Sequence, residues 1–401
     1  MWRRQAGHQK KETEFLSDVV ERVEHGRDPS DQILRTEADQ EPLIFESLKT
    51  PQTPSHHAEG PFLRDHLRLM LRVLSAVVND QLHLTQIEEL ARLKGFEGEV
   101  EEIEETIKEN SALFEVFVLV HDAAKWTTVY FDAPEGSRGR ALGFLESHFA
   151  HRHDIGISER AKFRSRYLEL YETFASERIG QSETQIQTEF YLIYSIDSHY
   201  ANHDKLIHAR TYRELLERVS KRHRLAPRDV DLLETLITHH LDPITDFRSI
   251  RPQAVLRYHA LAVKHGYDAD DFIDLLQGCV FLDTVCASKQ VTVSGSTHDT
   301  AVLTNFLQSE HDFAPWRRTE KERVREDRHT RERNTIFREV GLDGIALMDL
   351  LEMEASPQFG QILRRIHEAI VTGNPLPHFK KEIDAELVKR VEQFYEKTFL
   401  V

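Results

Sequence analysis

The stretch Phe114–Trp126, FEVFVLVHDAAKW, is a nearly unbroken apolar run that ends in a histidine, an aspartate and a lysine. Such a run predicts a buried core helix, where unpaired imidazole and carboxylate groups are costly. His121 and Asp122 are therefore expected to share a partner, and a transition-metal ion is the common partner of this pair. On a helix, Lys125 points to the same side and could hold an anionic substrate there. An ordinary ion pair at the end of a core helix is the alternative.

Length and composition indicate a globular chain of two domains. The 401 residues include 30% charged and 40% apolar residues, and the formal net charge is −16. Cys279 and Cys286 are the only cysteines, which excludes a disulfide framework or a cysteine zinc cluster. No apolar stretch reaches the roughly 18–20 residues of a membrane span, and the basic N-terminus has no hydrophobic region behind it. We therefore expect a cytoplasmic protein without broad, sequence-independent affinity for nucleic acid.

The periodicity of apolar residues predicts an all-α fold in three parts. Residues 1–50 are expected to form a polar arm, and residues 51–310 a helical domain. Within that domain, residues 155–215 read as an inserted helical hairpin. Residues 311–401 are expected to form a C-terminal helical region.

Several other chemistry-bearing side chains interrupt or end apolar helices. Asp283 falls on the buried face of the helix predicted at 272–283, where a carboxylate needs a counter-charge. This is a second, independent indication of a metal. The remaining candidate ligands are His66, His148 (preferred over His151 and His153), His239 and His240. Asp197 and His199 end another apolar run, and we interpret them as a structural pair in the insertion rather than as part of a site.

Arginines are concentrated between Arg317 and Arg333, interleaved with acidic residues. This pattern is typical of an exposed helix stabilised by pairs of opposite charge four residues apart. A basic strip that binds RNA or phosphate is the alternative interpretation.

The ordered set His66, His121–Asp122, His148, His239–His240 and Asp283 resembles the HD-domain superfamily of metal-dependent phosphohydrolases. The segments 57–60 (HAEG), 121–125 (HDAAK), 236–240 (LITHH) and 265–268 (HGYD) are similar to the HD region of bacterial tRNA nucleotidyltransferases. The segment 341–348, continuing to Gly373, is similar to the part that follows this domain in that family. The resemblance covers about residues 55–155 and 215–375.

The resemblance implies an HD-type helical bundle with a divalent metal site. In the family's pattern, one metal would be held by His66, His121, Asp122 and Asp283. Asp122 could bridge to a second metal held by His148 and His240, with His239 joining or supporting it. Mn, Fe, Co, Ni and Zn all suit such ligands. Metal-activated water would hydrolyse a phosphomonoester or phosphodiester of a nucleotide, an RNA end or another phosphorylated small molecule, while Lys125 neutralises the phosphoryl oxygens.

Two departures from the family limit what carries over. The short N-terminal arm has no counterpart of the nucleotidyltransferase head, so CCA addition is not expected. Residues 155–215 also exceed what the family has between these motifs. Two alternatives stay open: a regulatory module that binds metal, nucleotide or RNA without catalysis, and a deoxynucleoside triphosphate triphosphohydrolase.

Overall fold

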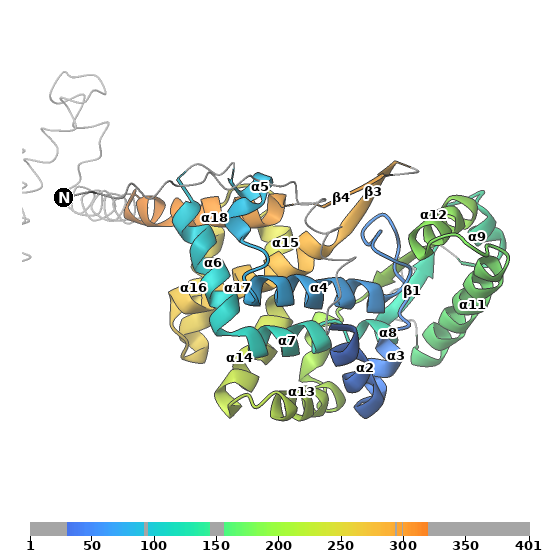
Figure 1. The fold of residues 1–401 in the computed structure, drawn as a ribbon, viewed down its shortest axis with the longest axis horizontal. Coiled ribbons are helices and arrows are strands. Elements are labelled where there is room, and N and C mark those ends of the chain that lie inside the picture. Colours follow the sequence, from blue (N-terminus) through green and yellow to red (C-terminus); the bar gives the residue numbers. More distant parts are fainter. Residues whose placement is uncertain (1–29, 92–94, 145–155, 293–294, 299, 320–401) are drawn as a thin grey trace, which may run out of the picture. The chain divides into compact units, whose positions relative to one another are not determined.

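The computed structural model describes residues 30–91, 95–144, 156–292, 295–298 and 300–319. The chain divides into two units, residues 1–313 and 314–401. The first unit is mainly helical, which confirms the predicted all-α class (Figure 1). Two short antiparallel pairs of strands accompany the helices: β1 (Val129–Asp132) with β2 (Asp197–Tyr200), and β3 (Ser288–Thr292) with β4 (Gly295–His298).

Helices α4 (Leu63–Val78) and α7 (Ser111–Val120) lie side by side at the centre of this unit (Figure 1). Phe114 and Phe117 of α7 are fully buried, so the predicted core helix is confirmed. Helix α17 (Ala269–Val280) also packs against α7, and Gly278 allows the close approach. A Cβ atom at Gly278 would lie 2.5 Å from Cζ of Phe114.

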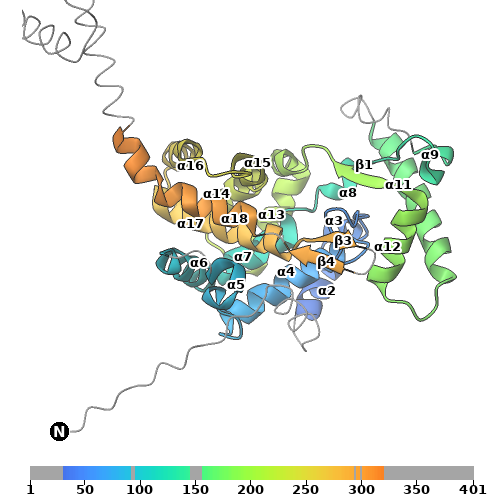
Figure 2. The same cartoon turned by 90° about the horizontal axis from the view of Figure 1, so that it is seen from above.

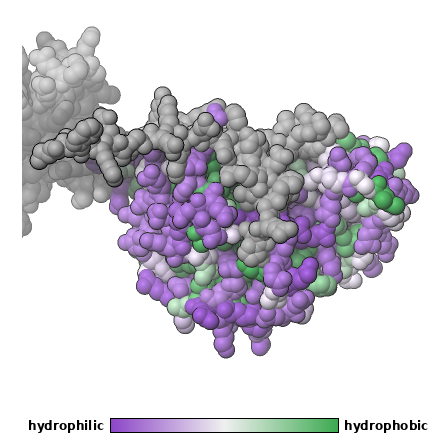
Figure 3. Space-filling model, viewed as in Figure 1, coloured by the Kyte–Doolittle hydropathy of each residue, from purple (hydrophilic) through white to green (hydrophobic). Residues whose placement is uncertain are grey.

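The other described helices of this unit follow in chain order. They are α2 (Ser30–Gln40), α3 (Pro42–Ser47), η1 (Leu84–Gln86), α5 (Glu88–Ala91), α6 (Glu97–Glu109), α8 (Lys125–Thr128), α9 (Arg138–Ala141), α11 (Ile157–Ser176), α12 (Glu183–Tyr194), η2 (Asp204–His208), α13 (Arg210–Arg222), α14 (Pro227–His239), α15 (Asp242–Asp246), α16 (Pro252–His265), η3 (Phe281–Val285) and α18 (Ala301–His311). Within the described ranges, none of the helices has the length and apolar character needed to cross a bilayer. On the face shown in Figure 3, hydrophilic side chains predominate over the described elements.

The structure describes residues 30–50 of the predicted arm. Of these, residues 30–47 pack against the helical domain. Ile44 of α3 is fully buried. Arg222 of α13 contacts the carboxylates of both Glu37 and Glu41, at 2.5 and 2.8 Å. Burial of Ile44 and these partly buried ion pairs attach α2 and α3 to the domain. The predicted polar arm therefore includes two helices that pack against the domain.

Within the predicted insertion, residues 155–215, helices α11 and α12 form a hairpin, which lies at one end of the unit in both views (Figures 1 and 2). Helix α12 ends at Tyr194 because Ser195 takes a left-handed conformation, with φ of 51°. Residues 197–200 then form strand β2, where the sequence was interpreted as helix. Strand β2 pairs with β1, which follows Lys125 closely in the chain, and so connects the insertion to the candidate site.

The insertion also fixes the loop that precedes α4. The side-chain amide of Gln187, in α12, donates to the backbone carbonyls of Gln52, His57 and Gly60 at 3.1, 2.8 and 2.8 Å. Gln187 is 2% exposed, so these bonds are shielded from water. The backbone of residues 52–60 is therefore held in one conformation by the insertion.

Two carboxyl groups near the contact of α17 and α18 should make the stability of the fold depend on pH. Burial, together with nearby carboxylates such as Glu102 and Asp270, raises the pKa of Asp274 and that of Glu310 to about 7. A raised folded-state pKa stabilises the fold at low pH, and this contribution is lost as pH rises through about 7. We expect the unfolding free energy of Glu310→Gln, measured by urea unfolding, to rise relative to that of wild type as the pH increases from about 5.5 to about 8.5. An equal difference in unfolding free energy at both pH values would contradict this expectation.

Candidate metal centre

Five buried side chains from four parts of the fold converge. They are His66 from α4, His121 and Asp122 from the end of α7, His240 from the end of α14, and Asp283 from η3, and each whole residue is at most 8% exposed. Their ligand atoms form two overlapping groups, His66–His121–Asp283 and His121–Asp122–His240, and within each group these atoms lie no more than 4.8 Å apart. His121 belongs to both groups.

The distances show how closely the carboxylates approach the imidazoles. Asp283 Oδ1 lies 3.3 Å from Nε2 of His66 and 3.8 Å from Nε2 of His121. Asp122 Oδ2 lies 3.3 Å from Nε2 of the same His121. Residues that are more than 200 positions apart in the sequence are thus in direct contact.

Local backbone geometry places two of these groups. Helix α7 ends at Val120, and His121 to Ala124 form a turn before α8 begins at Lys125. Asp283 lies in η3, a π-helical turn that continues α17. Such turns are rare and occur frequently at functional sites. Asp283 is therefore buried as predicted, although its backbone is not the regular α-helix that the sequence indicated.

Hydrogen bonds on the far side of the His121 and His240 rings orient the Nε2 atoms of these two residues toward the centre. Nδ1 of His121 lies 3.1 Å from the carbonyl oxygen of Phe117, and Nδ1 of His240 lies 2.6 Å from that of Ile237. A carbonyl oxygen only accepts, so Nδ1 carries the proton and Nε2 keeps its lone pair. This arrangement is characteristic of histidines that bind metals.

The donor atoms fit a divalent transition metal. Nε2 of His121 and Nε2 of His240 are buried and make no hydrogen bond within the described part of the structure. Two buried acceptors without hydrogen bonds are costly unless something else occupies their lone pairs. Imidazole nitrogens beside carboxylate oxygens suit Mn, Fe, Co, Ni or Zn.

The protonation states of three groups also favour a cation. Burial opposes the charge on Asp122, but His121 and Lys125 hold the pKa of this carboxyl well below its ordinary value. Burial likewise opposes the charge on Asp283, yet the hydrogen bond with His66 keeps its pKa below the usual range. Burial lowers the pKa of His240 to about 4. Near neutral pH Asp122, Asp283 and His240 are therefore in the forms that bind metals. Burial opposes the charge on His66, but Asp283 and Glu59 raise its pKa to about 9, so His66 must release a proton when a metal binds.

Lys125 lies beside this centre, although a turn rather than the continuous helix expected from the sequence connects it to Asp122. Its Nζ atom is 2.6 Å from Asp122 Oδ2 and 4.8 Å from the centre of the Tyr200 ring in β2. The side chain is buried, so Asp122 and the ring compensate for the lost hydration of the charge. Burial opposes the charge, but Asp122 raises the pKa of Lys125, which stays a cation.

His203 is a neighbour of the centre that was not among the predicted ligands. Its Nε2 atom lies 3.1 Å from Asp122 Oδ1, and its ring centre is 5.6 Å from that of His240. It is 4% exposed and comes from the insertion, just after β2. The signal available in the sequence was its position soon after the apolar run 190–200.

Other predicted residues lie elsewhere. His239 is not part of the two groups: its Nδ1 atom is 2.7 Å from Asp242, and its side chain is 27% exposed. His199 contacts Asp132 at 3.4 Å and stacks on Tyr130, and Asp197 pairs with Asp132 in the strand register, in agreement with a structural role for both. His148 and residues 320–333 of the arginine-rich segment lie outside the described residues.

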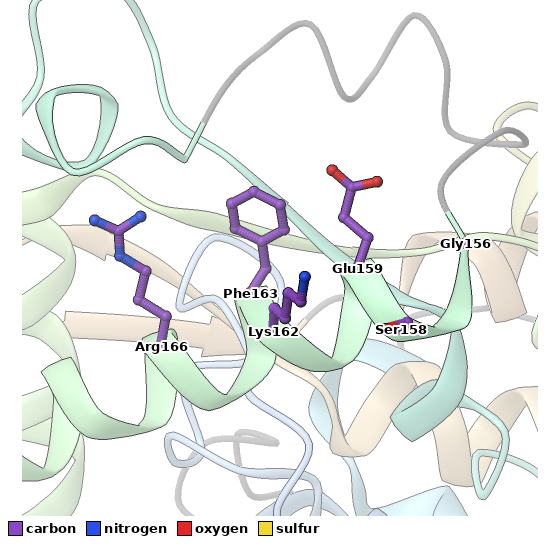
Figure 4. Close-up of a pocket in the computed structure, with 6 residues that line it drawn as sticks. All are labelled: Gly156, Ser158, Glu159, Lys162, Phe163 and Arg166. Atoms are coloured by element: carbon purple, nitrogen blue, oxygen red, sulfur yellow. The ribbon is translucent and has the colours of Figure 1, made fainter.

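A surface cavity of about 560 Å³ opens along the first turns of α11 (Figure 4). Its walls include Ser158, Glu159, Lys162, Phe163 and Arg166, all from one stretch of this helix. None of the converging residues lines it, so the cavity is separate from the candidate centre.

Comparisons of this chain with models of protein families, with curated proteins and with solved structures find no match. The chemistry of the converging side chains is therefore what points to a function.

Proposed function

We propose that this protein is a metal-dependent phosphohydrolase of the HD type. One observation carries the proposal: Nε2 atoms of His66, His121 and His240 meet the carboxylates of Asp122 and Asp283 in a buried cluster. Two of these nitrogens have no hydrogen-bond partner among the residues that the structure describes, and both carboxylates are charged near neutral pH. A cluster built only for stability would pair such groups with donors and acceptors of the protein.

Four of these residues would hold the metal, namely His66, His121, Asp122 and Asp283. When bound, a divalent metal lowers the pKa of its water to give hydroxide near neutral pH and polarises phosphate oxygens. The other oxygen of Asp122 faces His203, beside His240. These two imidazoles give the site further donors, which accommodates one or two ions.

Lys125 would stabilise the phosphate of the substrate. Its ammonium group is already held by Asp122 and Tyr200, so little reorganisation is needed when an anion arrives. Because the surroundings are buried, the attraction between this cation and developing negative charge is stronger than in water. Lys125 would therefore neutralise the phosphoryl oxygens.

The substrate class follows from this chemistry and from the resemblance given above. A phosphomonoester or phosphodiester of a nucleotide or of an RNA end is what we propose. The acidic net charge of the chain favours a small substrate or a strand end over extended contact with nucleic acid.

Phosphate release from a panel of nucleotides tests this function. The panel contains nucleoside monophosphates, 2′,3′-cyclic nucleotides and deoxynucleoside triphosphates, each with Mn, Ni, Co or Mg. We expect release of inorganic phosphate, or opening of the cyclic ester, with at least one transition metal and none with chelator. Release of intact triphosphate would identify the triphosphohydrolase alternative. Bound metal without turnover on any substrate would instead favour a regulatory binding module.

A further inference from the structure

Glu59 lies between two histidines just before α4. One of its carboxylate oxygens is 2.8 Å from Nδ1 of His57 and 2.9 Å from Nδ1 of His66. The Glu59 side chain is 4% exposed, and that of His66 is fully buried. On the opposite edge of the same ring, Nε2 of His66 faces Asp283.

The three histidines of the centre differ in how Nδ1 is held. His121 and His240 directly follow the last residues of α7 and α14, so Nδ1 of each can donate to a backbone carbonyl of the last helical turn, that of Phe117 or that of Ile237. His66 is the fourth residue of α4. The free backbone groups at that end of a helix are N–H donors, which cannot accept a proton from an imidazole. His66 therefore requires an acceptor from outside its own helix.

We propose that Glu59 is the positioning residue that supplies this acceptor and thereby sets the affinity of His66 for the metal. This inference rests on the metal centre proposed above. Glu59 holds the proton on Nδ1, so that Nε2 is the nitrogen that gives up its proton and binds when a metal ion takes the place of that proton beside Asp283, and the negative charge of Glu59 makes the imidazole a stronger donor. His57 donates to the same oxygen and holds Glu59 in place.

Helix α12 holds the backbone on both sides of Glu59. The amide of Gln187 binds the carbonyls of His57 and Gly60, the residues on either side of Ala58–Glu59. At Gly60, an added Cβ atom would lie 2.5 Å from the Asp65 side chain, so the loop packs tightly against α4. The position of Glu59 is thus fixed by backbone contacts that do not involve its own carboxylate.

Titration of the metal-free, full-length protein with Co²⁺ tests the proposal, with visible absorption as the signal and a chelator as competitor. We expect Glu59→Ala to bind Co²⁺ about 10–100-fold more weakly than wild type. Glu59→Gln keeps an acceptor oxygen without the charge and should recover part of the loss. Glu234→Ala is the matched control, because it removes the carboxylate 2.9 Å from the surface histidine His208 and should leave the affinity unchanged.

A second readout separates positioning from a general loss of structure. In the Co²⁺-loaded wild type, the Nδ1 proton of His66 should give a shifted proton resonance that exchanges slowly with water. We expect this resonance to be lost in Glu59→Ala while those of the other bound histidines remain. If Glu59→Ala does not fold, as judged by circular dichroism in chelator, the affinity of Glu59→Gln decides the question.

Two results would overturn the inference. One is that Glu59→Ala binds Co²⁺ with an affinity within about threefold of wild type, while His66→Ala loses binding. Such a change is much smaller than the one expected for a positioning residue. The other is loss of one whole equivalent of metal in His57→Ala, which would make His57, Glu59 and His66 a metal site of their own. Normal Co²⁺ binding by His66→Ala, or no binding by wild type, would instead overturn the proposed centre itself.

Discussion

Replacing Asp122 with alanine is expected to lower phosphate release by on the order of 10³-fold, equivalent to about 4 kcal/mol of transition-state stabilisation. Asp122 contacts His121, Lys125 and His203 at once, through both of its oxygens. Its loss would remove one of the proposed metal ligands and would also leave the buried Lys125 cation without its carboxylate. Initial rates at saturating metal, on the best substrate of the panel, measure the effect.

Asp231→Ala is the matched control for this prediction. Asp231 lies in α14, its side chain is 64% exposed, and it contacts Arg213 on the surface. Its replacement should leave the rate within about twofold of wild type, because exposed ion pairs contribute little. An Asp122→Ala variant that is folded and keeps more than about a tenth of the wild-type rate would contradict the role given to Asp122.

The second large effect concerns stability. Phe117 is fully buried in α7, stacks on the ring of His121 at 4.7 Å between ring centres, and contacts His240 edge-on at 6.1 Å. Phe117→Ala would leave a cavity against the rings of His121 and His240, two residues of the candidate centre. We expect the free energy of unfolding to fall by about 3–5 kcal/mol, measured by urea denaturation of the metal-free protein.

Added metal should recover part of this loss, because an ion that binds only the folded state stabilises it. Phe45→Ala serves as the control, since the Phe45 side chain in α3 is 47% exposed, and its effect should stay within about 0.5 kcal/mol. Equal destabilisation by the two replacements would show that the core beneath the centre is not packed as described.

Residues whose position follows from helical periodicity were predictable. The apolar run before His121 can only be accommodated in a core, so the pair at its end was bound to lie near other buried groups. Asp283 was placed by the same reasoning, and its approach to His66 agrees with it. Burial and period are local properties, and a single sequence is sufficient to reveal them.

Adjacent histidines show where that reasoning stops. His239 and His240 are the same type of residue at adjacent positions, but the side chains of neighbouring residues in a helix point about 100° apart. Only His240 faces the centre, whereas His239 contacts Asp242. The end of α14 decides between them, and helix ends are the features that a sequence defines least well.

The contributions of the insertion could not be derived from helical patterns. Strand β2 alternates its side chains, so that Ser198 contacts Thr53 and Tyr200 faces Lys125, while His199 points toward Asp132. A helix over the same residues would have grouped them differently. His203 reaches Asp122 only because this strand pairs with β1, a contact between segments about 70 residues apart.

Elemental analysis of the full-length protein, purified without chelator, tests the central claim most directly. The predicted result is about one or two equivalents of Mn, Fe, Co, Ni or Zn per chain, with most of it lost in His121→Ala, because His121 belongs to both groups of ligand atoms. Wild-type protein that contains none of these metals and takes up none when they are added would contradict the account.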